Sequence, residues 1–182
     1  MRLASALASD AAGGQGVLDP IVRAIRPGAL VSGPASTVRV TVNDNLDLRR
    51  ALQAGGLQRK MLVIAGGSQS RAACMGGNLA RDLKEAGIVG VVTDAPVRDS
   101  AEIAGLGLPV WSRGVTPIKP AKVGGGDVAV EVELGGVTVR PGDWVIADDD
   151  GVVIWPRERL DELNARAAEL DRAERGLGGA TG

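Results

Sequence analysis

The sequence predicts an α/β fold in which a central parallel strand–helix–strand part precedes a set of antiparallel strands. Between residues 61 and 114, short apolar segments alternate with amphipathic ones, which is typical of parallel strands joined by right-handed helical crossovers. From residue 123 onward, apolar and polar residues alternate with a period of two, and a Gly-Gly pair separates the segments, which favours antiparallel hairpins. Because no linker or internal repeat divides the 182 residues, we expect a single domain over residues 1–182.

The first third of the chain is expected to contain two helices and one strand. The segment 18–28 (LDPIVRAIRPG) places Asp19 as an N-cap and Pro20 at the first helical position, so it predicts a short helix. The alternation of β-branched residues predicts a strand over 37–42 (TVRVTV). The segment 45–56 (NLDLRRALQAGG) predicts a helix that ends at its two glycines.

The middle third is expected to alternate strictly between strand and helix. Strands are predicted over 61–67, 88–94 and 109–114, where apolar β-formers predominate. Helices are predicted between them, over 74–87 and 100–107. Ligands of parallel α/β sheets bind beyond the carboxyl ends of the strands, so the segments that follow the first two strands are the candidate site.

The last third is expected to form an antiparallel meander and then a helix. In the meander, Glu131 and Glu133 face one way and their apolar neighbours the other; these neighbours are Val128, Val130, Val132 and Leu134. Asp148–Gly151 (DDDG) predicts a turn, with a supporting role at the site as the alternative. The helix is predicted over 157–175, and its apolar stripe consists of Leu160, Leu163, Ala167 and Leu170. This stripe can pack either on its own domain or against another subunit.

The composition excludes several kinds of site. The chain has no His, which excludes His-based catalysis and His metal ligands. It has no Tyr or Phe and only three Trp, which nearly excludes platforms for base stacking. Its 21 basic and 22 acidic residues give a net charge of −1, so no nucleic-acid partner is expected. Any metal must be held by oxygen atoms, which favours Mg²⁺, Mn²⁺ or Ca²⁺ over zinc.

Cysteine usage and hydropathy give further expectations. Cys74 is the only cysteine, so no disulfide framework exists, and a small buried core residue is expected there. No segment approaches the roughly 20 apolar residues of a membrane span, and residues 1–10 lack the apolar region of a secretory signal. We therefore expect a cytoplasmic protein without a membrane partner.

Two features follow the first two strands of the middle third. The glycine-rich stretch from Gly76 to Leu79 starts a helix, whose unpaired N–H groups suit a carboxylate or phosphate. Tight packing of helix and strand also explains these glycines. Arg98 and Asp99 place a cation and a carboxylate side by side after the next strand, and a simple turn cap with an exposed arginine also explains them.

Together the two features form the pattern G-x20-R-D-x2-E, from Gly77 through Arg98 and Asp99 to Glu102. With this pattern the chain resembles the family of class II 4-hydroxy-4-methyl-2-oxoglutarate aldolases and the regulator of ribonuclease activity A (RraA). Three stretches carry the rest of the likeness, which extends over about residues 15–160. They are GPASTVRV (33–40), GIVGVVTDAPVRDSAEIAGLGLPVWSRGVTP (87–117) and VTVRPGDWVIADDDGVVIWP (137–156).

The resemblance implies a β/β/α fold like that of the swivelling phosphohistidine domain, and a homotrimer or hexamer with active sites between subunits. It also implies a divalent-metal-dependent lyase that cleaves 4-hydroxy-2-oxo diacids to pyruvate and a second oxo acid, and that decarboxylates oxaloacetate. By position, Asp99 would hold Mg²⁺ (or Mn²⁺ or another divalent cation), and Arg98 would bind the oxo-acid end of the substrate. The substrate carboxylate would be bound by the backbone around Gly76, Gly77, Asn78 and Leu79.

The chain departs from the family pattern at two places. Many family aldolases carry an acid where this chain has Gly77, and that acid helps to move the proton of the substrate hydroxyl. Oxaloacetate decarboxylation has no such proton, so we expect it to exceed retro-aldol cleavage here. The usual Pro-Gly-Asp before the strand at Met61 is replaced by GLQRKM (56–61), which predicts altered contacts in the first half.

Two other functional classes are compatible with the family. RraA itself inhibits a ribonuclease by protein contact, but a protein that only binds has no need for a metal ligand at Asp99. A methyltransferase, a label long attached to this family, needs a glycine-rich loop followed by an acidic ribose-binding strand end. The sequence contains no such arrangement.

Overall fold

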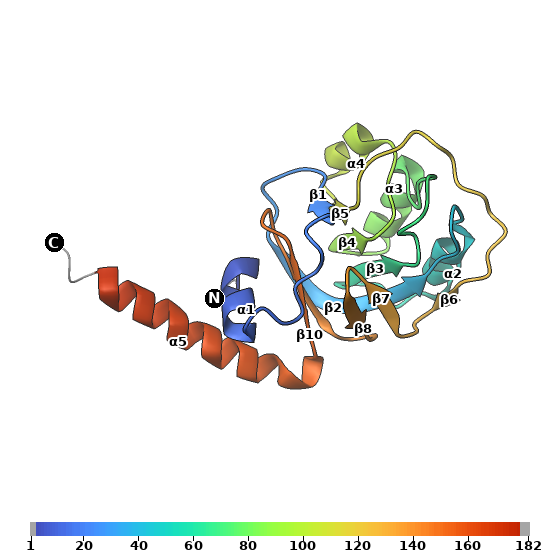
Figure 1. Ribbon diagram of the computed structural model, residues 1–182. Coiled ribbons are helices and arrows are strands. Elements are labelled where there is room, and N and C mark those ends of the chain that lie inside the picture. The colour runs from blue at the N-terminus through green and yellow to red at the C-terminus, as the bar shows by residue number, and fades with distance from the viewer. Residues whose placement is uncertain (1–2, 179–182) are drawn as a thin grey trace.

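The computed structural model describes residues 3–178, which form a curled mixed sheet flanked by helices and a small hairpin (Figure 1). The main sheet has the strand order β1-β5-β4-β3-β2-β9-β10, and β6 also pairs with β2. Its strands are β1 (Arg23–Ala24), β2 (Val31–Arg39), β3 (Met61–Ala65), β4 (Gly90–Thr93), β5 (Val110–Ser112), β6 (Asp127–Val128), β9 (Trp144–Ala147) and β10 (Val152–Trp155). A separate two-stranded sheet is formed by β7 (Val132–Leu134) and β8 (Val137–Val139).

The parallel part of the sheet consists of β2, β3, β4 and β5, which lie next to one another in chain order. Three helices connect these strands: α2 (Leu46–Ala54), α3 (Gly77–Glu85) and α4 (Ser100–Leu106). Because each right-handed crossover moves one strand further in the same direction, all three helices lie on one face of the sheet. The α/β fold class predicted from the sequence is confirmed.

Around the parallel strands, the molecule has three layers in the order helix, sheet, hairpin. One apolar cluster joins the sheet to α2, α3 and α4 through Leu48, Leu83 and Ile103. A second cluster joins the opposite face of the sheet to the β7–β8 hairpin, with Trp111 fully buried at its centre. The expected β/β/α order of layers is therefore present.

The prediction of a helix over 18–28 is wrong. This segment forms a turn at Pro20 and then strand β1, which pairs antiparallel with β5. The carboxylate of Asp19 accepts the N–H of Ile21 at 2.9 Å, which makes a side-chain turn instead of a helix cap. Leu18 then donates its N–H to Val152, so backbone pairing with distant strands replaces helical hydrogen bonds.

The strand expected over 37–42 begins earlier, at Val31, and ends at Arg39. It changes partner along its length: residues 31–34 pair with β9, and residues 35–39 pair with β3. Because β2 takes β9 as a partner, the expectation of a single antiparallel meander is also wrong. The β7–β8 and β9–β10 hairpins form, but β9 pairs with β2 rather than with β8, so the two hairpins belong to different sheets.

The C-terminal helix packs on its own chain. A short 3-10 turn (Arg157–Arg159) leads into α5 (Leu160–Gly178), and α1 (Ser5–Ala12) lies against it (Figure 1). Leu163 and Ala167 are fully buried in a cluster with Ala8 and Ala11 of α1, whereas Leu170 is 37% exposed. Helix α1 was not expected from the sequence, and contact of α5 with another subunit stays a prediction.

The remaining expectations for single elements are confirmed. Helices α2, α3 and α4 and strands β3, β4 and β5 lie within their predicted ranges. Cys74 is buried, and burial raises the pKa of its thiol to about 12, so it is a neutral core residue. Within residues 3–178, no helix combines the length and the apolar character that crossing a bilayer requires.

Candidate active site

Three chain segments lie side by side beyond the carboxyl ends of the parallel strands. Parallel backbone bridges join Met75 to Val97 and Val97 to Val115. The N–H of Arg98 donates to the carbonyl oxygen of Met75 at 2.9 Å, and the N–H of Cys74 donates to that of Pro96 at 2.9 Å. These bonds continue the strand pairing past the sheet, and they bring the start of α3 next to the start of α4.

At this junction, Arg98 and Asp99 lie against the glycine pair. A Cβ atom at position 76 would lie 2.6 Å from Oδ2 of Asp99 and 2.8 Å from Nε of Arg98, so glycine leaves the room that both side chains occupy. Oδ2 of Asp99 accepts the N–H of Gly77 at 3.1 Å and lies 3.4 Å from Nε of Arg98. The structure thus brings together four of the residues predicted from the sequence.

The backbone of Asp99 explains where its carboxylate points. Asp99 is the N-cap residue of α4, yet its φ of 55° is left-handed and its side chain makes no capping hydrogen bond. An N-cap aspartate ordinarily accepts an N–H of the helix that it begins. Here the carboxylate crosses to Gly77 on the neighbouring helix, in a backbone conformation that aspartate tolerates better than most residues. The simple cap that would explain Arg98 and Asp99 is therefore not formed.

The amino end of α3 provides further hydrogen-bond donors. The N–H of Gly77 donates to the carboxylate of Asp99, and the N–H of Ala80 donates to the carbonyl oxygen of Gly76 at 3.0 Å. Between them, the N–H groups of Asn78 and Leu79 lie in the first helical turn, where no intrahelical acceptor exists. These two groups point the positive end of the helix dipole toward the site.

Glu102 is a site residue to which the sequence analysis gave no role. A Cβ atom at position 77 would overlap the carboxylate of Glu102, so this carboxylate occupies the space beside Gly77. Arg81 on α3 holds it there through an ion pair of 2.6 Å. Position 77 carries no acid, but the carboxylate of Glu102, in the first turn of α4, lies beside it.

A cavity of about 100 Å³ opens next to these residues, and its lining is basic. It is lined by Asn45, Arg49, Gly76, Asn78, Leu79, Arg98, Lys119, Pro120 and Lys122. Arg49, Lys119 and Lys122 were not predicted from the sequence; the two lysines had a signal in the Lys-Pro-Ala-Lys stretch after β5, whereas Arg49 on α2 had none. The arrangement suits a small anion with more than one negative charge.

The residues present fit a hard divalent cation that is completed by water and substrate. Mg²⁺ in enzymes is commonly bound by one or two carboxylates, with the remaining oxygen ligands from water and substrate. The Asp99 side chain is 41% exposed and supplies such a carboxylate. Among the residues that the structure describes, no three His, Cys, Asp or Glu side chains are grouped to hold a metal without other ligands. Asp99 is therefore the residue that would hold such an ion.

Asp94, at the end of β4, has a structural role in the glycine turn after β3. Burial raises the pKa of its carboxyl, whereas the N–H groups of Gly67 and Gly66 and the nearby Arg113 act in the opposite direction. The two N–H groups donate to Asp94 at 2.9 and 3.1 Å. Asp94 therefore fixes this turn.

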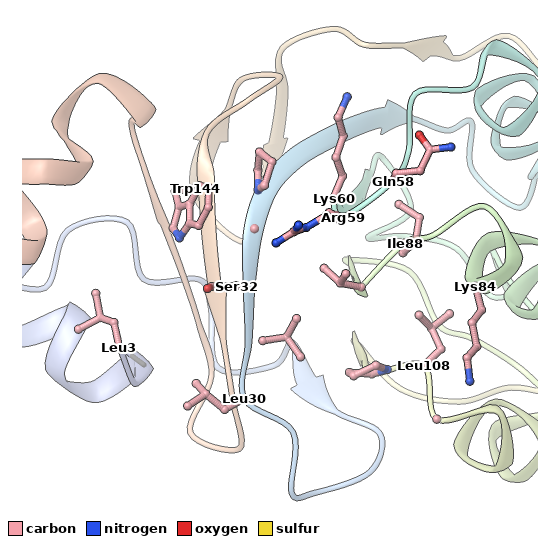
Figure 2. Close-up of a pocket in the computed structure, with 16 residues that line it drawn as sticks. Leu3, Leu30, Ser32, Gln58, Arg59, Lys60, Lys84, Ile88, Leu108 and Trp144 are labelled. Carbon is pink, nitrogen blue, oxygen red and sulfur yellow. The ribbon is translucent and has the colours of Figure 1, made fainter. Parts of the chain in front are cut away.

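A larger cavity of about 860 Å³ lies at the opposite edge of the sheet (Figure 2). Its lining includes Val31, Lys60, Val89 and Pro109, at or just before the first residues of the parallel strands. Ligands of parallel α/β sheets bind at the other, carboxyl edge. The smaller basic cavity beside Arg98 is therefore the better candidate for catalysis.

Comparison with known proteins agrees with the geometry. The chain matches the family model described as RraA-like (Aldolase/RraA) over residues 5–154. A protein of Alkalilimnicola ehrlichii, named "Putative 4-hydroxy-4-methyl-2-oxoglutarate aldolase", is 39% identical over 138 residues, which are 76% of this chain and 84% of that protein.

Two solved structures are similar over most of the chain. The RNA-processing inhibitor RraA from Thermus thermophilis has a TM-score of 0.77 and 33% identity, over 86% of this chain and 94% of its own. RraAS2 of Streptomyces coelicolor, described as an unusual member of the RNase ES inhibitor RraA protein family, has a TM-score of 0.87 and 28% identity, over 98% and 94% of the two chains. The matched residues 5–154 include both the glycine pair and the Arg98–Asp99 pair. The chain therefore belongs to the RraA-like family of aldolases and RraA proteins.

Proposed function

We propose that this protein is a divalent-metal-dependent lyase that cleaves a carbon–carbon bond of 2-oxo acids and releases pyruvate. The aldolase name of its relatives supports a lyase. The observation that carries the proposal is the position of the Asp99 carboxylate. It makes no capping hydrogen bond to α4 and instead accepts the N–H of Gly77, beside Arg98. A surface that only binds another protein gives no reason for this arrangement.

In this proposal, the substrate binds through its oxo-acid end. The planar guanidinium of Arg98 binds the carboxylate at this end through two parallel hydrogen bonds. The N–H groups of Asn78 and Leu79 bind the same carboxylate from the amino end of α3. The substrate is thereby oriented with its keto oxygen toward Asp99.

Asp99 would hold the divalent cation, which when bound would polarise the keto group and stabilise negative charge on its oxygen. Cleavage of the bond between C3 and C4 leaves an enolate on the pyruvate fragment, which takes up a proton at C3 from water to give pyruvate. Arg98 lies next to this charge and stabilises it as it develops. No lysine has to form a covalent bond with the substrate.

The two candidate reactions differ in the proton that has to move. Retro-aldol cleavage of a 4-hydroxy-2-oxo acid requires a base for the hydroxyl proton, and Glu102 is the carboxylate beside Gly77 that can accept it. Decarboxylation of oxaloacetate needs no such base. The reaction thus depends on Arg98 and Asp99 in both cases, and on Glu102 only in the first.

The proposal is tested by measuring pyruvate release from oxaloacetate and from 4-hydroxy-4-methyl-2-oxoglutarate, with Mg²⁺ and with a chelator. We expect Mg²⁺-dependent release that Asp99→Ala lowers by about 100-fold or more, the size of effect seen when a charge-stabilising group is removed. Asp10→Ala, at an exposed acid on α1, is the matched control. A wild-type protein without Mg²⁺- or Mn²⁺-dependent release from any such acid would overturn the proposal.

The second candidate is a protein-binding regulator of ribonuclease activity. It is favoured by the similarity to RraA structures over nearly the whole chain. Inhibition of a ribonuclease by wild type and Asp99→Ala alike, together with no pyruvate release by wild type, would support this reading over the lyase.

A further inference from the structure

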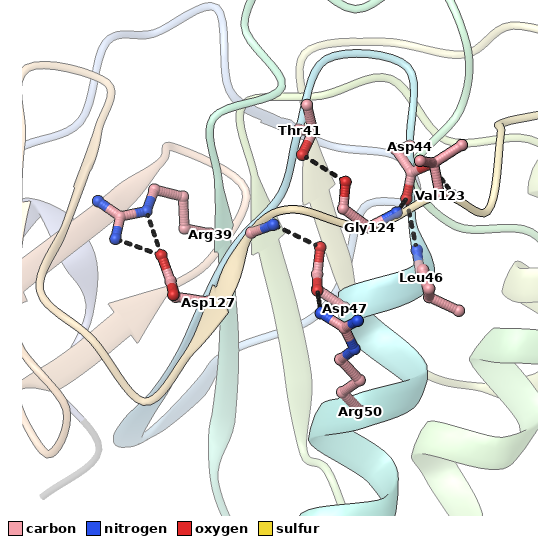
Figure 3. Close-up of polar contacts among 10 residues, drawn as sticks. Arg39, Thr41, Asp44, Leu46, Asp47, Arg50, Val123, Gly124 and Asp127 are labelled. Carbon is pink, nitrogen blue, oxygen red and sulfur yellow. Dashed lines mark hydrogen bonds and ion pairs between the residues drawn. The ribbon is translucent and has the colours of Figure 1, made fainter.

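The loop between β5 and β6 carries Lys119 and Lys122, two of the basic residues in the cavity beside Arg98. The loop contains no helix or strand over residues 113–126. A loop without regular structure holds lysine side chains in place only if other groups fix its backbone. The contacts of this loop with the segment that starts α2 do so (Figure 3).

Asp44 holds the loop and the start of α2 at the same time. Its buried carboxylate accepts the N–H of Val123 at 2.6 Å and that of Gly124 at 3.1 Å. The same carboxylate accepts the N–H of Leu46, the first residue of α2, at 2.9 Å. Of these three charge-assisted hydrogen bonds to one carboxylate, two fix the residues that follow Lys122, and the third joins them to the start of α2.

The loop is also held on both sides of this contact. Before Lys122, the N–H of Ala121 donates to the carbonyl oxygen of Asn43 at 2.8 Å. Further on, the N–H of Gly126 donates to the buried carboxylate of Asp47 at 3.0 Å. A Cβ atom at Gly126 would overlap the carbonyl oxygen of Arg39, so the loop approaches β2 as closely as glycine allows. The backbone at Lys122 is therefore anchored from residue 121 to residue 126.

The basic side chains that line the cavity differ in whether they lie near a carboxylate. Its lining has four basic side chains and no acidic one. Arg98 lies beside Asp99, and Arg49 is 3.6 Å from Asp82 on α3. Within residues 3–178, neither Lys119 nor Lys122 takes part in an ion pair, and both are exposed. Lys119 and Lys122 are therefore available to bind a second anionic group of a ligand whose first anionic group is bound by Arg98.

We propose that Asp44 is a positioning residue for substrate selection: it fixes the loop so that Lys122, with Lys119, binds the substrate carboxylate remote from Arg98. This inference rests on the proposed function and assigns the residues that distinguish a 2-oxo diacid from a 2-oxo monoacid. Asp44 does not touch the substrate. It acts by holding the backbone on which Lys122 stands.

The test compares two ligands that differ only at the remote end. 2-Oxoglutarate and 2-oxopentanoate have five carbons each, and the first ends in a carboxylate where the second ends in a methyl group. Their dissociation constants are measured by titration calorimetry with Mg²⁺ on wild type, Lys122→Met, Asp44→Asn and the double variant. Lys60→Met, at the opposite edge of the sheet, controls for the loss of one positive charge.

We expect Lys122→Met and Asp44→Asn each to weaken 2-oxoglutarate binding by about 10-fold, the scale of one hydrogen bond to a charged group. Binding of 2-oxopentanoate should change by less than about 2-fold, and the Lys60 control should behave as wild type. The double variant should lose little more than either single variant, because both changes remove the same contact. A stabilising role alone would move both ligands together and would add to the effect of Lys122→Met.

Several results would overturn the inference. Equal affinity of wild type for the two ligands would do so, as would unchanged selectivity in Lys122→Met, whose exposed position leaves the core intact. Mg²⁺-dependent pyruvate release with no loss of selectivity in either variant would reject the positioning role and leave the proposed function standing. Absence of both binding and pyruvate release in wild type would reject the two together.

Discussion

At the scale of single residues, the candidate site depends on two glycines that leave room for carboxylates. Gly76 leaves room for Asp99 and Arg98, and Gly77 leaves room for Glu102. Gly77 is not among the residues with a positive φ, so space rather than backbone conformation requires glycine there. The expectation of weak retro-aldol activity, drawn from the missing acid at position 77, therefore has to be tested against Glu102.

We predict that Glu102→Ala lowers retro-aldol cleavage by about 10²- to 10⁴-fold, the usual contribution of a positioned base, and lowers oxaloacetate decarboxylation far less. Gly77→Asp on its own should be poorly tolerated because its side chain meets Glu102. In the Glu102→Ala background, Gly77→Asp has the vacated space and should restore part of the retro-aldol rate. Steady-state rates for the two substrates decide this. Equal losses in both reactions would contradict a role for Glu102 as the base.

The carboxylate of Asp44 predicts a pH dependence of stability. Burial by itself raises the pKa of Asp44, but the hydrogen bonds from the N–H groups of Leu46, Val123 and Gly124 outweigh burial and lower it. A lowered pKa in the folded state contributes stability above the unfolded value near 3.8, and this stability is lost as the pH falls through the folded value. In urea unfolding, the advantage of wild type over Asp44→Asn should therefore shrink between pH 6 and pH 3. A constant advantage over this range would contradict the assignment.

At the scale of elements, the contact between α1 and α5 closes the outer side of the β9–β10 hairpin. Leu163 lies fully buried in the cluster that joins these helices to Ile146, Val153 and Trp155. The indole N–H of Trp155 donates to the carbonyl oxygen of Arg159 at 3.0 Å, which fixes the start of the last helix. The amphipathic stripe of α5 thus has a partner within its own chain over its first half.

We predict that Leu163→Ala lowers the free energy of unfolding by about 2 to 5 kcal/mol, as buried leucine-to-alanine changes do. Leu170→Ala, in the same stripe but 37% exposed, should cost clearly less. Urea denaturation with a common m-value measures both. Equal and small losses would mean that α5 does not pack on α1 in solution.

At the scale of the whole molecule, the candidate site lies at the surface and is flanked by exposed apolar side chains. The loop that carries Lys119 and Lys122 also carries Val115, Ile118 and Val123, which are 62%, 44% and 82% exposed. Apolar side chains gathered beside a polar cavity are typical of a surface that another chain covers. This is consistent with the homotrimer or hexamer expected from the family.

We predict a trimer or a dimer of trimers in multi-angle light scattering at micromolar concentration. Ile118→Asp and Val123→Asp should shift the protein toward smaller species, because a charge in a buried subunit contact is costly. Val17→Asp, at an exposed valine before β1, is the control. A wild-type monomer, or assembly unaffected by either loop variant, would contradict this prediction.

The sequence by itself determined the parallel core and the position of the reactive pair. Strands β3, β4 and β5 and the helices between them are patterned by local apolar periodicity, and each crossover joins neighbours in the chain. Arg98 and Asp99 lie in the segment between β4 and α4, so their place at the carboxyl edge of the sheet follows from the order of elements.

Only the tertiary structure decided the features that arise from contacts between segments distant in the chain. Residues 18–28 could form a helix in isolation, but pairing with Val110 and Val152 made them a turn and a strand. Glu102 meets Gly77 only because two helices start side by side, and the lysine loop is fixed by hydrogen bonds that its N–H groups donate to Asp44 across 79 and 80 residues of chain. Local patterns cannot encode such contacts, because the partners have no fixed spacing in the chain and meet only when the whole sheet has formed.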